Sequence, residues 1–295
     1  MDLLGPSIED MFRERKWKFT VKTVAMLAKR MLRVVEFVHK KGLVHRDLKP
    51  ENFLLGRQGT PTANEIYLVD FGMAKQYRDP KTQEHIPYRE KQPLSGTPRY
   101  MSINTHLGQE QSRRDDLETL YHVWLYFLKG SLPWQRIKAA TKEEKRMRIG
   151  EKKQETTTND LCAGFPEEFS EGLEYVRGLR FEDQPDYNHI QDLLSRVLRK
   201  AGEVDDGEFD WVKAGEKRPI KLAIRLPTEP VGGNAAPPAP PTAIGMTGKR
   251  PRTDSVPDPG QSRARRPPVL LHRIHGVGVA KTASIKEAPG DCQSS

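Results

Sequence analysis

The sequence has 295 residues and a formal net charge of +9, with 36% hydrophobic and 30% charged residues, as in a globular protein with a polar extension. No apolar run approaches the roughly 20 residues that a membrane-spanning helix requires, and the amino terminus lacks the pattern of a secretory signal. The two cysteines, Cys162 and Cys292, lie far apart, which argues against a disulfide framework or a zinc site and indicates a reducing compartment, cytoplasmic or nuclear. The basic charge has no aromatic or helical readout elements beside it, so we expect no nucleic-acid partner.

The first strong helical pattern lies in residues 20–41. Before it, Ser7 can cap a short helix, with Asp10 three residues later as a capping-box partner. Gly42 ends the longer pattern, and His39, Lys40 and Lys41 suit its negative carboxyl end. Apolar residues recur at helical spacing, and we assign this stripe to the core: Val24, Ala28, Met31, Val35 and Val38.

The stretch from Leu43 to Leu55 places an acid, a lysine and an amide at fixed offsets. It reads Leu-Val-His-Arg-Asp-Leu-Lys-Pro-Glu-Asn-Phe-Leu-Leu, and short apolar runs on both sides predict a rigid loop between two small strands. The acid, the lysine and the amide are Asp47, Lys49 and Asn52. A serine or threonine hydroxyl is a weak nucleophile, and an acid such as Asp47 can orient it and accept its proton.

A second acidic turn follows a short apolar strand. Residues 66–69 (Ile-Tyr-Leu-Val) end at Asp70-Phe71-Gly72, a pattern that places a carboxylate at the edge of a pocket. The polar turn Arg57–Glu65 joins this strand to the preceding one as a hairpin. Together the two stretches match the catalytic-loop and metal-loop motifs of protein kinases. In that chemistry Asn52 and Asp70 hold Mg²⁺, and Lys49 reaches the phosphoryl group of ATP.

Beyond Gly72 the chain alternates between polar segments and helical patterns. The polar segment from Lys75 to Pro93 is predicted to be the activation loop. Asp116 is predicted to begin a helix that is apolar on most sides and therefore buried at the centre of a helical lobe. We expect two further helices at about 166–180 and 188–200. The apolar residues of the central helix are Leu117, Leu120, Tyr121, Trp124, Phe127 and Leu128.

From about residue 226 the composition changes, since twelve of the 23 prolines lie in residues 226–295. Such sequence buries too little apolar area to offset its ordering entropy, so we predict a disordered basic tail over 214–295, after a first domain over 1–213. Two basic clusters, 249–252 and 263–266, are open to two interpretations, a nuclear import signal or a solvated tail. Membrane association is expected only through this tail, where Cys292 is a weak candidate for acylation at the plasma membrane. The oligomeric state is not predicted.

Over roughly residues 1–213 the chain resembles the casein kinase 1 family of protein serine/threonine kinases, and most closely its fungal branch. A Ser-Ile-Asn run stands where most kinases have Ala-Pro-Glu, which is a mark of this family. The lysine two residues after Asp47 is the serine/threonine-type pattern. The stretches that carry the resemblance, besides the two loops, are 3–7 (Leu-Leu-Gly-Pro-Ser), 85–90 (His-Ile-Pro-Tyr-Arg-Glu), 102–108 (Ser-Ile-Asn-Thr-His-Leu-Gly), 110–116 (Glu-Gln-Ser-Arg-Arg-Asp-Asp), 130–134 (Gly-Ser-Leu-Pro-Trp) and 185–187 (Pro-Asp-Tyr).

The resemblance implies a role for further residues on the nucleotide side. Leu3 and Leu4 match the interlobe hinge that meets the adenine, Ser7 and Asp10 match positions near the ribose, and Leu54 matches the apolar floor beneath the base. The implied cofactors are ATP and Mg²⁺.

The resemblance also implies a catalytic and a substrate-binding set. Thr97 matches the threonine that hydrogen-bonds the catalytic acid and lysine, and Asp116 the acid that braces the catalytic loop, although it is also a candidate helix N-cap. His45 is expected to pack under Phe71. Arg99 and Lys145 match positions that bind an anion on acidic or already phosphorylated protein substrates, and an internal ion pair is the alternative for Arg99. Arg136 stands where the family has glycine, and it could strengthen or block that site.

The sequence as given begins at the stretch that matches the hinge. The expected fold is therefore a mainly α carboxyl-terminal lobe of a protein kinase with short β-hairpins, and the β-rich amino-terminal lobe, with its glycine-rich loop and strand lysine, is expected to be absent. Without those parts the activity of this chain alone is doubtful. Two hypotheses follow: a catalytic segment of a longer kinase, or a non-catalytic, pseudokinase-like binding module.

Overall fold

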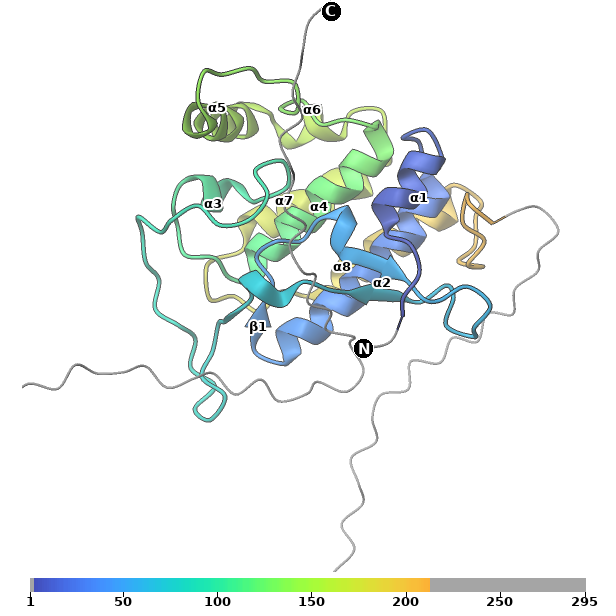
Figure 1. Ribbon diagram of the computed structural model, residues 1–295, viewed down its shortest axis with the longest axis horizontal. Coiled ribbons are helices and arrows are strands. Elements are labelled where there is room, and N and C mark those ends of the chain that lie inside the picture. The colour runs from blue at the N-terminus through green and yellow to red at the C-terminus, as the bar shows by residue number, and fades with distance from the viewer. Residues whose placement is uncertain (1–2, 213–295) are drawn as a thin grey trace, which may run out of the picture. The chain divides into compact units, whose positions relative to one another are not determined.

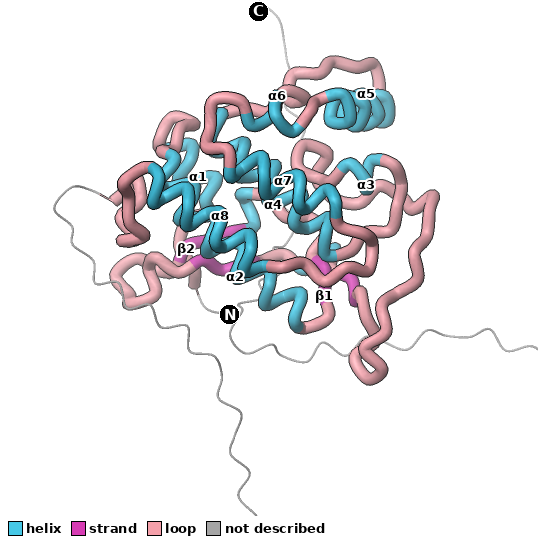
Figure 2. The backbone as a smooth tube through the Cα atoms, turned by 180° about the vertical axis from the view of Figure 1, so that it is seen from behind, coloured by secondary structure: helices cyan, strands magenta, loops and turns pink. Residues whose placement is uncertain are grey.

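The computed structural model describes residues 3–212, and helices are the main regular secondary structure of this part of the chain (Figures 1 and 2). The tail residues discussed above, including Cys292 and the two basic clusters, lie outside the described residues. Within residues 3–212, no helix is both long enough and apolar enough to cross a bilayer. The helices are α1 (Ile8–Glu14), α2 (Val21–Lys40), α3 (Ile103–His106), α4 (Arg113–Lys129), α5 (Lys142–Glu155), α6 (Thr158–Cys162), α7 (Glu168–Gly178) and α8 (Tyr187–Lys200).

Helix α4 lies at the centre of the helical part, where it packs against α2 and α7. Its side chains from Leu117 to Leu128 are all buried, as the sequence predicts for a helix that is apolar on most sides. Helix α8 packs against both α2 and α7 and completes the group, which Figure 2 shows from behind. The resulting core is rich in aromatic rings, and its largest buried side chains include Trp124, Trp134, Tyr121, Phe12 and Phe127.

The start of α4 corrects one prediction. The helix begins at Arg113 rather than Asp116, because Ser112 is its N-cap residue and the Ser112 amide donates to the Asp115 carboxylate at 2.8 Å. Asp116 lies inside the first turn and is not the N-cap. This turn carries no apolar signal in the sequence, since Arg113 and Asp115 are polar and nevertheless buried.

The predicted amino-terminal cap of α1 is present. Ser7 accepts a hydrogen bond from the Asp10 amide, and the Asp10 carboxylate accepts one from the Ser7 amide, so the capping box of α1 is confirmed. Thr20 caps α2 and also donates to Asp210, near the end of the described residues. This contact ties the segment after α8 back to α2.

Helices α7 and α8 match the two predicted at about 166–180 and 188–200. Helices α3, α5 and α6 were not predicted. Helix α5 has no apolar stripe, because only Ile149, Gly150 and Lys153 are buried among its fourteen residues. The periodicity that reveals amphipathic helices is therefore missing from it.

Four short strands form two antiparallel pairs in the described residues. Strand β2 (Phe53–Leu55) pairs with β3 (Ile66–Leu68), which confirms the predicted hairpin around the turn 57–65. Strand β1 (Leu43–Val44) pairs with β4 (Lys75–Gln76). Two short 3-10 helices, η1 (Pro50–Asn52) and η2 (Phe71–Met73), lie between these strands. The catalytic-loop stretch therefore runs from β1 to β2, and Asp70 lies between β3 and η2.

Two glycines of α7 provide a matched test of helix packing. A Cβ atom at Gly172 would lie 1.9 Å from the Tyr121 hydroxyl oxygen on α4, whereas one at Gly178 would meet no atom within 4 Å. Gly172→Ala is expected to destabilise the protein by about 1–3 kcal/mol, because α7 must move away from α4. Gly178→Ala is expected to be neutral or slightly stabilising. Urea unfolding of both variants checks this, and equal stabilities would contradict the close packing of α7 on α4.

Candidate active site

The carboxylate of Asp47 is held at both of its oxygens. Thr97 donates from its hydroxyl to one oxygen at 2.7 Å, and the Lys49 ammonium donates to the other at 2.9 Å. The Asp47 side chain is only 11% exposed. The resemblance predicted that Thr97 would bond both the acid and the lysine; instead, Lys49 contacts Asp47 directly. These two hydrogen bonds fix the orientation of the Asp47 carboxylate next to a cation. A carboxylate that orients a substrate hydroxyl must be fixed in this way.

Lys49 remains a cation in this site. Partial burial lowers the pKa of Lys49, but the hydrogen bond and charge of Asp47, together with the charges of Glu51 and Asp70, more than offset this, so its pKa is raised. The charge of Asp70, on the second loop, is the smallest of these contributions. The site thus combines two carboxylates and one ammonium.

Asn52 and Asp70 offer free oxygen atoms. The Asn52 amide nitrogen donates to the Asp47 carbonyl at 3.0 Å, and its backbone carbonyl accepts from the Val69 amide at 3.0 Å, so it links the two loops. Its side-chain oxygen and the Asp70 carboxylate have no hydrogen-bond or ion-pair partner within residues 3–212. Oxygen donors of this kind suit Mg²⁺, which keeps other positions for water and phosphate oxygens. The described residues contain no cluster of three or more metal-ligating His, Cys, Asp or Glu side chains.

The backbone at two positions of the site is strained. Asp70 has φ of 62° and ψ of 65°, in the left-handed region, and Arg46 has φ of 69°. Such conformations cost about 1–3 kcal/mol for a residue with a side chain and persist only where surrounding contacts enforce them. Here the Arg46 guanidinium donates to the Met73 carbonyl at 2.6 Å and so ties the first loop to the end of η2.

Asp116 holds the backbone of the loop that carries Asp47. Its carboxylate accepts from the backbone amides of His45 at 2.7 Å and Arg46 at 2.9 Å, and it lies 2.9 Å from the Nε2 atom of His39 on α2. The other ring nitrogen of His39 lies 2.7 Å from the Tyr187 hydroxyl of α8. The bracing role predicted for Asp116 is thereby confirmed, and His39 and Tyr187 are partners that the sequence did not reveal.

His45 serves packing, as predicted. Its ring meets that of Phe71 edge to face, with centroids 5.0 Å apart, and its Nε2 atom lies 3.1 Å from the Val69 carbonyl. Burial lowers the pKa of His45, so it stays neutral near pH 7. His45 is fully buried, beneath the surface that carries Asp47.

The segment that matches a hinge runs beside β2. Gly5 donates from its amide to the Leu55 carbonyl at 2.8 Å, and the Leu55 amide donates to the Pro6 carbonyl at 2.9 Å. Leu3 is 73% exposed, Leu4 is half-buried, and Leu54 is half-buried on β2, where it pairs with Ser7. The structure therefore brings Leu54 and Ser7 together, whereas the Ser7 and Asp10 side chains bond to each other.

The predicted anion-binding residues lie on separate elements. Arg99 lies between Thr97 and α3, where its guanidinium donates to the Tyr100 hydroxyl and lies over the Tyr100 and Tyr126 rings. It forms no ion pair in the described part of the chain, although the charges of Glu51 and Glu9 act on it. Lys145 on α5 and Arg136 are exposed and also lack ion pairs in residues 3–212. No direct contact joins these three cations.

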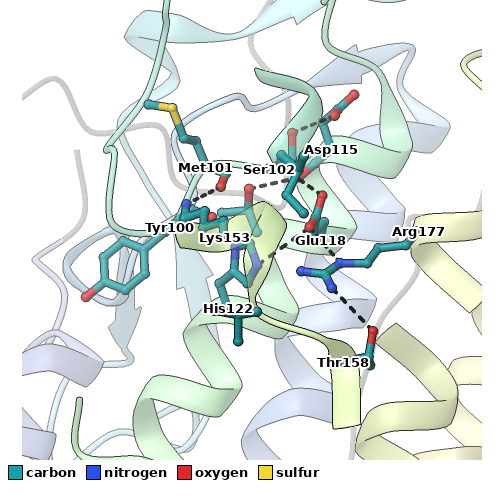
Figure 3. A network of polar contacts seen from close by, with 12 residues as sticks. Tyr100, Met101, Ser102, Asp115, Glu118, His122, Lys153, Thr158 and Arg177 are labelled. Atoms are coloured by element: carbon teal, nitrogen blue, oxygen red, sulfur yellow. Dashed lines mark hydrogen bonds and ion pairs between the residues drawn. The ribbon is translucent and has the colours of Figure 1, made fainter. Parts of the chain in front are cut away.

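The Ser-Ile-Asn run is anchored by acids of α4, which the sequence did not reveal (Figure 3). Ser102 caps α3 and donates from its hydroxyl to Asp115 at 2.6 Å. The Ile103 amide donates to Glu118, whose carboxylate also accepts from Arg177 of α7 at 3.0 Å. Glu118 and Arg177 lie far apart in sequence, so no local pattern could have paired them.

Comparison with known proteins identifies the family of this chain. The model of the family described as "Protein kinase domain" matches residues 3–202. The chain therefore belongs to the protein kinase domain family.

Within that family its similarity is to fungal casein kinase I homologues. It is 60% identical over 212 residues to "Casein kinase I homolog 2" of Schizosaccharomyces pombe, and the aligned region covers 72% of this chain and 49% of that protein. It is 56% identical over 224 residues to "Casein kinase I homolog 1" of Saccharomyces cerevisiae, which covers 76% of this chain and 42% of that protein. The resemblance inferred from the motifs is confirmed. The chain spans about half, or less, of the length of these relatives.

Proposed function

We propose that the protein is a serine/threonine protein kinase of casein kinase 1 type, which transfers the γ-phosphoryl group of ATP to serine or threonine in acidic or pre-phosphorylated protein substrates. The observation that carries this proposal is the carboxylate of Asp47, held by Thr97 and Lys49 beside the unpaired carboxylate of Asp70. The kinase domain match and the casein kinase I relatives support it.

In this proposal Asp47 receives the substrate hydroxyl. Its fixed carboxylate orients the hydroxyl oxygen toward the γ-phosphorus and accepts the proton as the oxygen–phosphorus bond forms. Lys49, a cation next to Asp47, lies where it can neutralise charge on the transferred phosphoryl group. Thr97 keeps Asp47 in place through its hydrogen bond, so we assign it a positioning role.

Asn52 and Asp70 are the residues that would hold Mg²⁺. Their free oxygens fit its preference for hard ligands, and the small number of protein ligands leaves positions for phosphate oxygens. When bound, Mg²⁺ supplies positive charge that neutralises the phosphate oxygens. The hydrogen bonds of Asn52 to the Asp47 and Val69 backbones keep both loops at a fixed separation.

The nucleotide and the substrate would use surfaces on either side of Asp47. Leu3 and Leu4 would meet the adenine through their backbone, Leu54 would lie beneath it, and Ser7 and Asp10 would lie near the ribose. On the substrate side, the unpaired cations Arg99, Lys145 and Arg136 favour an acidic or phosphorylated residue.

Phosphoryl transfer to matched peptides tests this function. The protein, purified from its natural source, is incubated with Mg²⁺, labelled ATP and three peptides: one with a serine, one with a phosphoserine upstream of that serine, and one with alanine in place of the serine. The proposal predicts label in the first two, more in the second, and none in the third. Absence of label from all three would favour the non-catalytic binding module instead.

A further inference from the structure

One lysine is buried in the helical part with no role in the site described so far. Lys153 of α5 is 0% exposed. Its Nζ atom donates to the Met101 carbonyl at 2.6 Å (Figure 3). It also donates to the Pro98 carbonyl at 2.9 Å and lies 5.1 Å from the centre of the Trp134 ring. A buried ammonium is costly, so a lysine at this position requires compensating contacts.

The two carbonyls flank Arg99. Between them, the Arg99 carbonyl accepts a hydrogen bond from the Trp134 indole nitrogen at 2.7 Å. Three carbonyls of residues 98–101 are thus held by Lys153 and Trp134. The amides of Tyr100 and Met101 bond back to the Thr97 carbonyl. This turn fixes the backbone from which the Arg99 side chain extends.

Lys153 also fixes the helix that carries Lys145. The two lysines are separated by about two turns of α5, which is about 12 Å along the axis. Helix α5 has few other buried side chains, Ile149 among them, so Lys153 is a main attachment of this helix to residues 98–101. Lys153 therefore connects helix α5, which carries Lys145, to the turn that carries Arg99.

The charges around Lys153 are compatible with this attachment. Glu118 of α4 is paired with Arg177 of α7, and burial lowers the pKa of the nearby His106 and His122, so both are neutral near pH 7. Burial also lowers the pKa of Lys153 to about 7. The ammonium has three N–H donors and the neutral amine has two, so either form can donate to both carbonyls.

We propose that Lys153 is a positioning residue that joins the Arg99 turn and helix α5 into one anion-binding unit for the substrate. The proposal rests on the proposed kinase function and deepens its substrate side. The unit would take a phosphoserine or a carboxylate upstream of the serine that receives the phosphoryl group. Lys153 itself touches neither substrate nor nucleotide.

The test compares Lys153→Met with Lys152→Met, the exposed neighbour on the same helix. For Lys153→Met we expect KM for the phosphoserine peptide to rise about tenfold, equal to the loss of about 1.4 kcal/mol of binding free energy. We expect kcat, KM for ATP and KM for the unphosphorylated peptide to stay within about twofold, the signature of lost binding rather than lost chemistry. Lys152→Met should resemble the wild type, and Lys153→Arg should recover part of the loss.

An equal change in the kinetics of both peptides, or no change in a folded Lys153→Met protein, would overturn the proposal. If Lys153→Met shows no cooperative unfolding transition, Trp134→Phe is the second variant, because it keeps Lys153 and an aromatic ring but removes the indole N–H that donates to the Arg99 carbonyl, and it should cause the same selective loss. Fluorescence anisotropy of the labelled phosphoserine peptide gives the affinity without turnover. A wild-type protein that binds this peptide but transfers no phosphate would refute the kinase function and not the positioning role.

Discussion

Asp47→Asn is expected to lower the rate of phosphoryl transfer by about 10²–10⁴-fold. The amide keeps the size of the side chain and can still accept from Thr97, but it cannot accept the proton of the substrate hydroxyl. The free energy of unfolding should change far less than the rate, because Asp47 lies outside the hydrophobic core and the amide keeps the hydrogen bond from Thr97. Initial rates with saturating Mg-ATP and the serine peptide measure the effect.

Asp192→Asn is the matched control for this variant. Asp192 is exposed on α8 and has no hydrogen bond or ion pair in residues 3–212, so the same chemical change there should leave the rate unaltered. A rate for Asp47→Asn within a few-fold of the wild type would refute the role of Asp47. A matching loss in Asp192→Asn would point to the preparation rather than to the site.

Asp116→Ala is expected to cause the largest loss of stability, about 3–5 kcal/mol, because it leaves buried groups without their partner. The amides of His45 and Arg46 and the His39 ring would all lose their acceptor. The catalytic loop would lose its brace at the same time. Urea unfolding at pH 7 measures the loss, with Asp192→Ala as the control that should stay within about 0.5 kcal/mol of the wild type.

The same variant has a pH signature. Burial raises the pKa of Asp116, but the hydrogen bond and charge of His39 and the contacts of His45 outweigh it, so its pKa lies below the ordinary value of 3.8. A carboxyl whose pKa is lowered by folding contributes stability above its unfolded pKa and loses that contribution as pH falls through the folded pKa. The gap between wild type and Asp116→Ala should therefore be full at pH 7 and narrow below about pH 4. A gap that widened in acid would contradict this assignment.

The sequence predicted the elements whose signals are local. The stripe of Val24 to Val38 predicted α2 to within a residue or two, and the turn 57–65 predicted the β2–β3 hairpin. The loop residues Asp47 and Asn52 could be found because their functional groups lie within one short motif. Asp70 could be found in the same way, from the second motif. The loop with Asp47 follows β1 and the turn with Asp70 follows β3.

The features that the sequence did not predict depend on contacts with residues distant in sequence or with backbone atoms. Helix α5 lacks an apolar stripe, and Lys153 looks like one more surface lysine in the run Gly-Glu-Lys-Lys, although its partners are carbonyls about fifty residues earlier. Arg113 and Asp115 are polar residues in a buried turn, which displaced the predicted start of α4. Charge pairs such as Glu118 with Arg177 become visible only when the helices are packed.

The most direct test of these residue roles is the initial rate of phosphate transfer from ATP to the serine peptide as Mg²⁺ is titrated against a chelator. We expect a rate that is near zero without Mg²⁺, rises to saturation with it, and depends on the serine hydroxyl and on Asp47. A rate independent of Mg²⁺, or the same rate in Asp47→Asn, would contradict the assignment of Asn52 and Asp70 to the metal and of Asp47 to the hydroxyl.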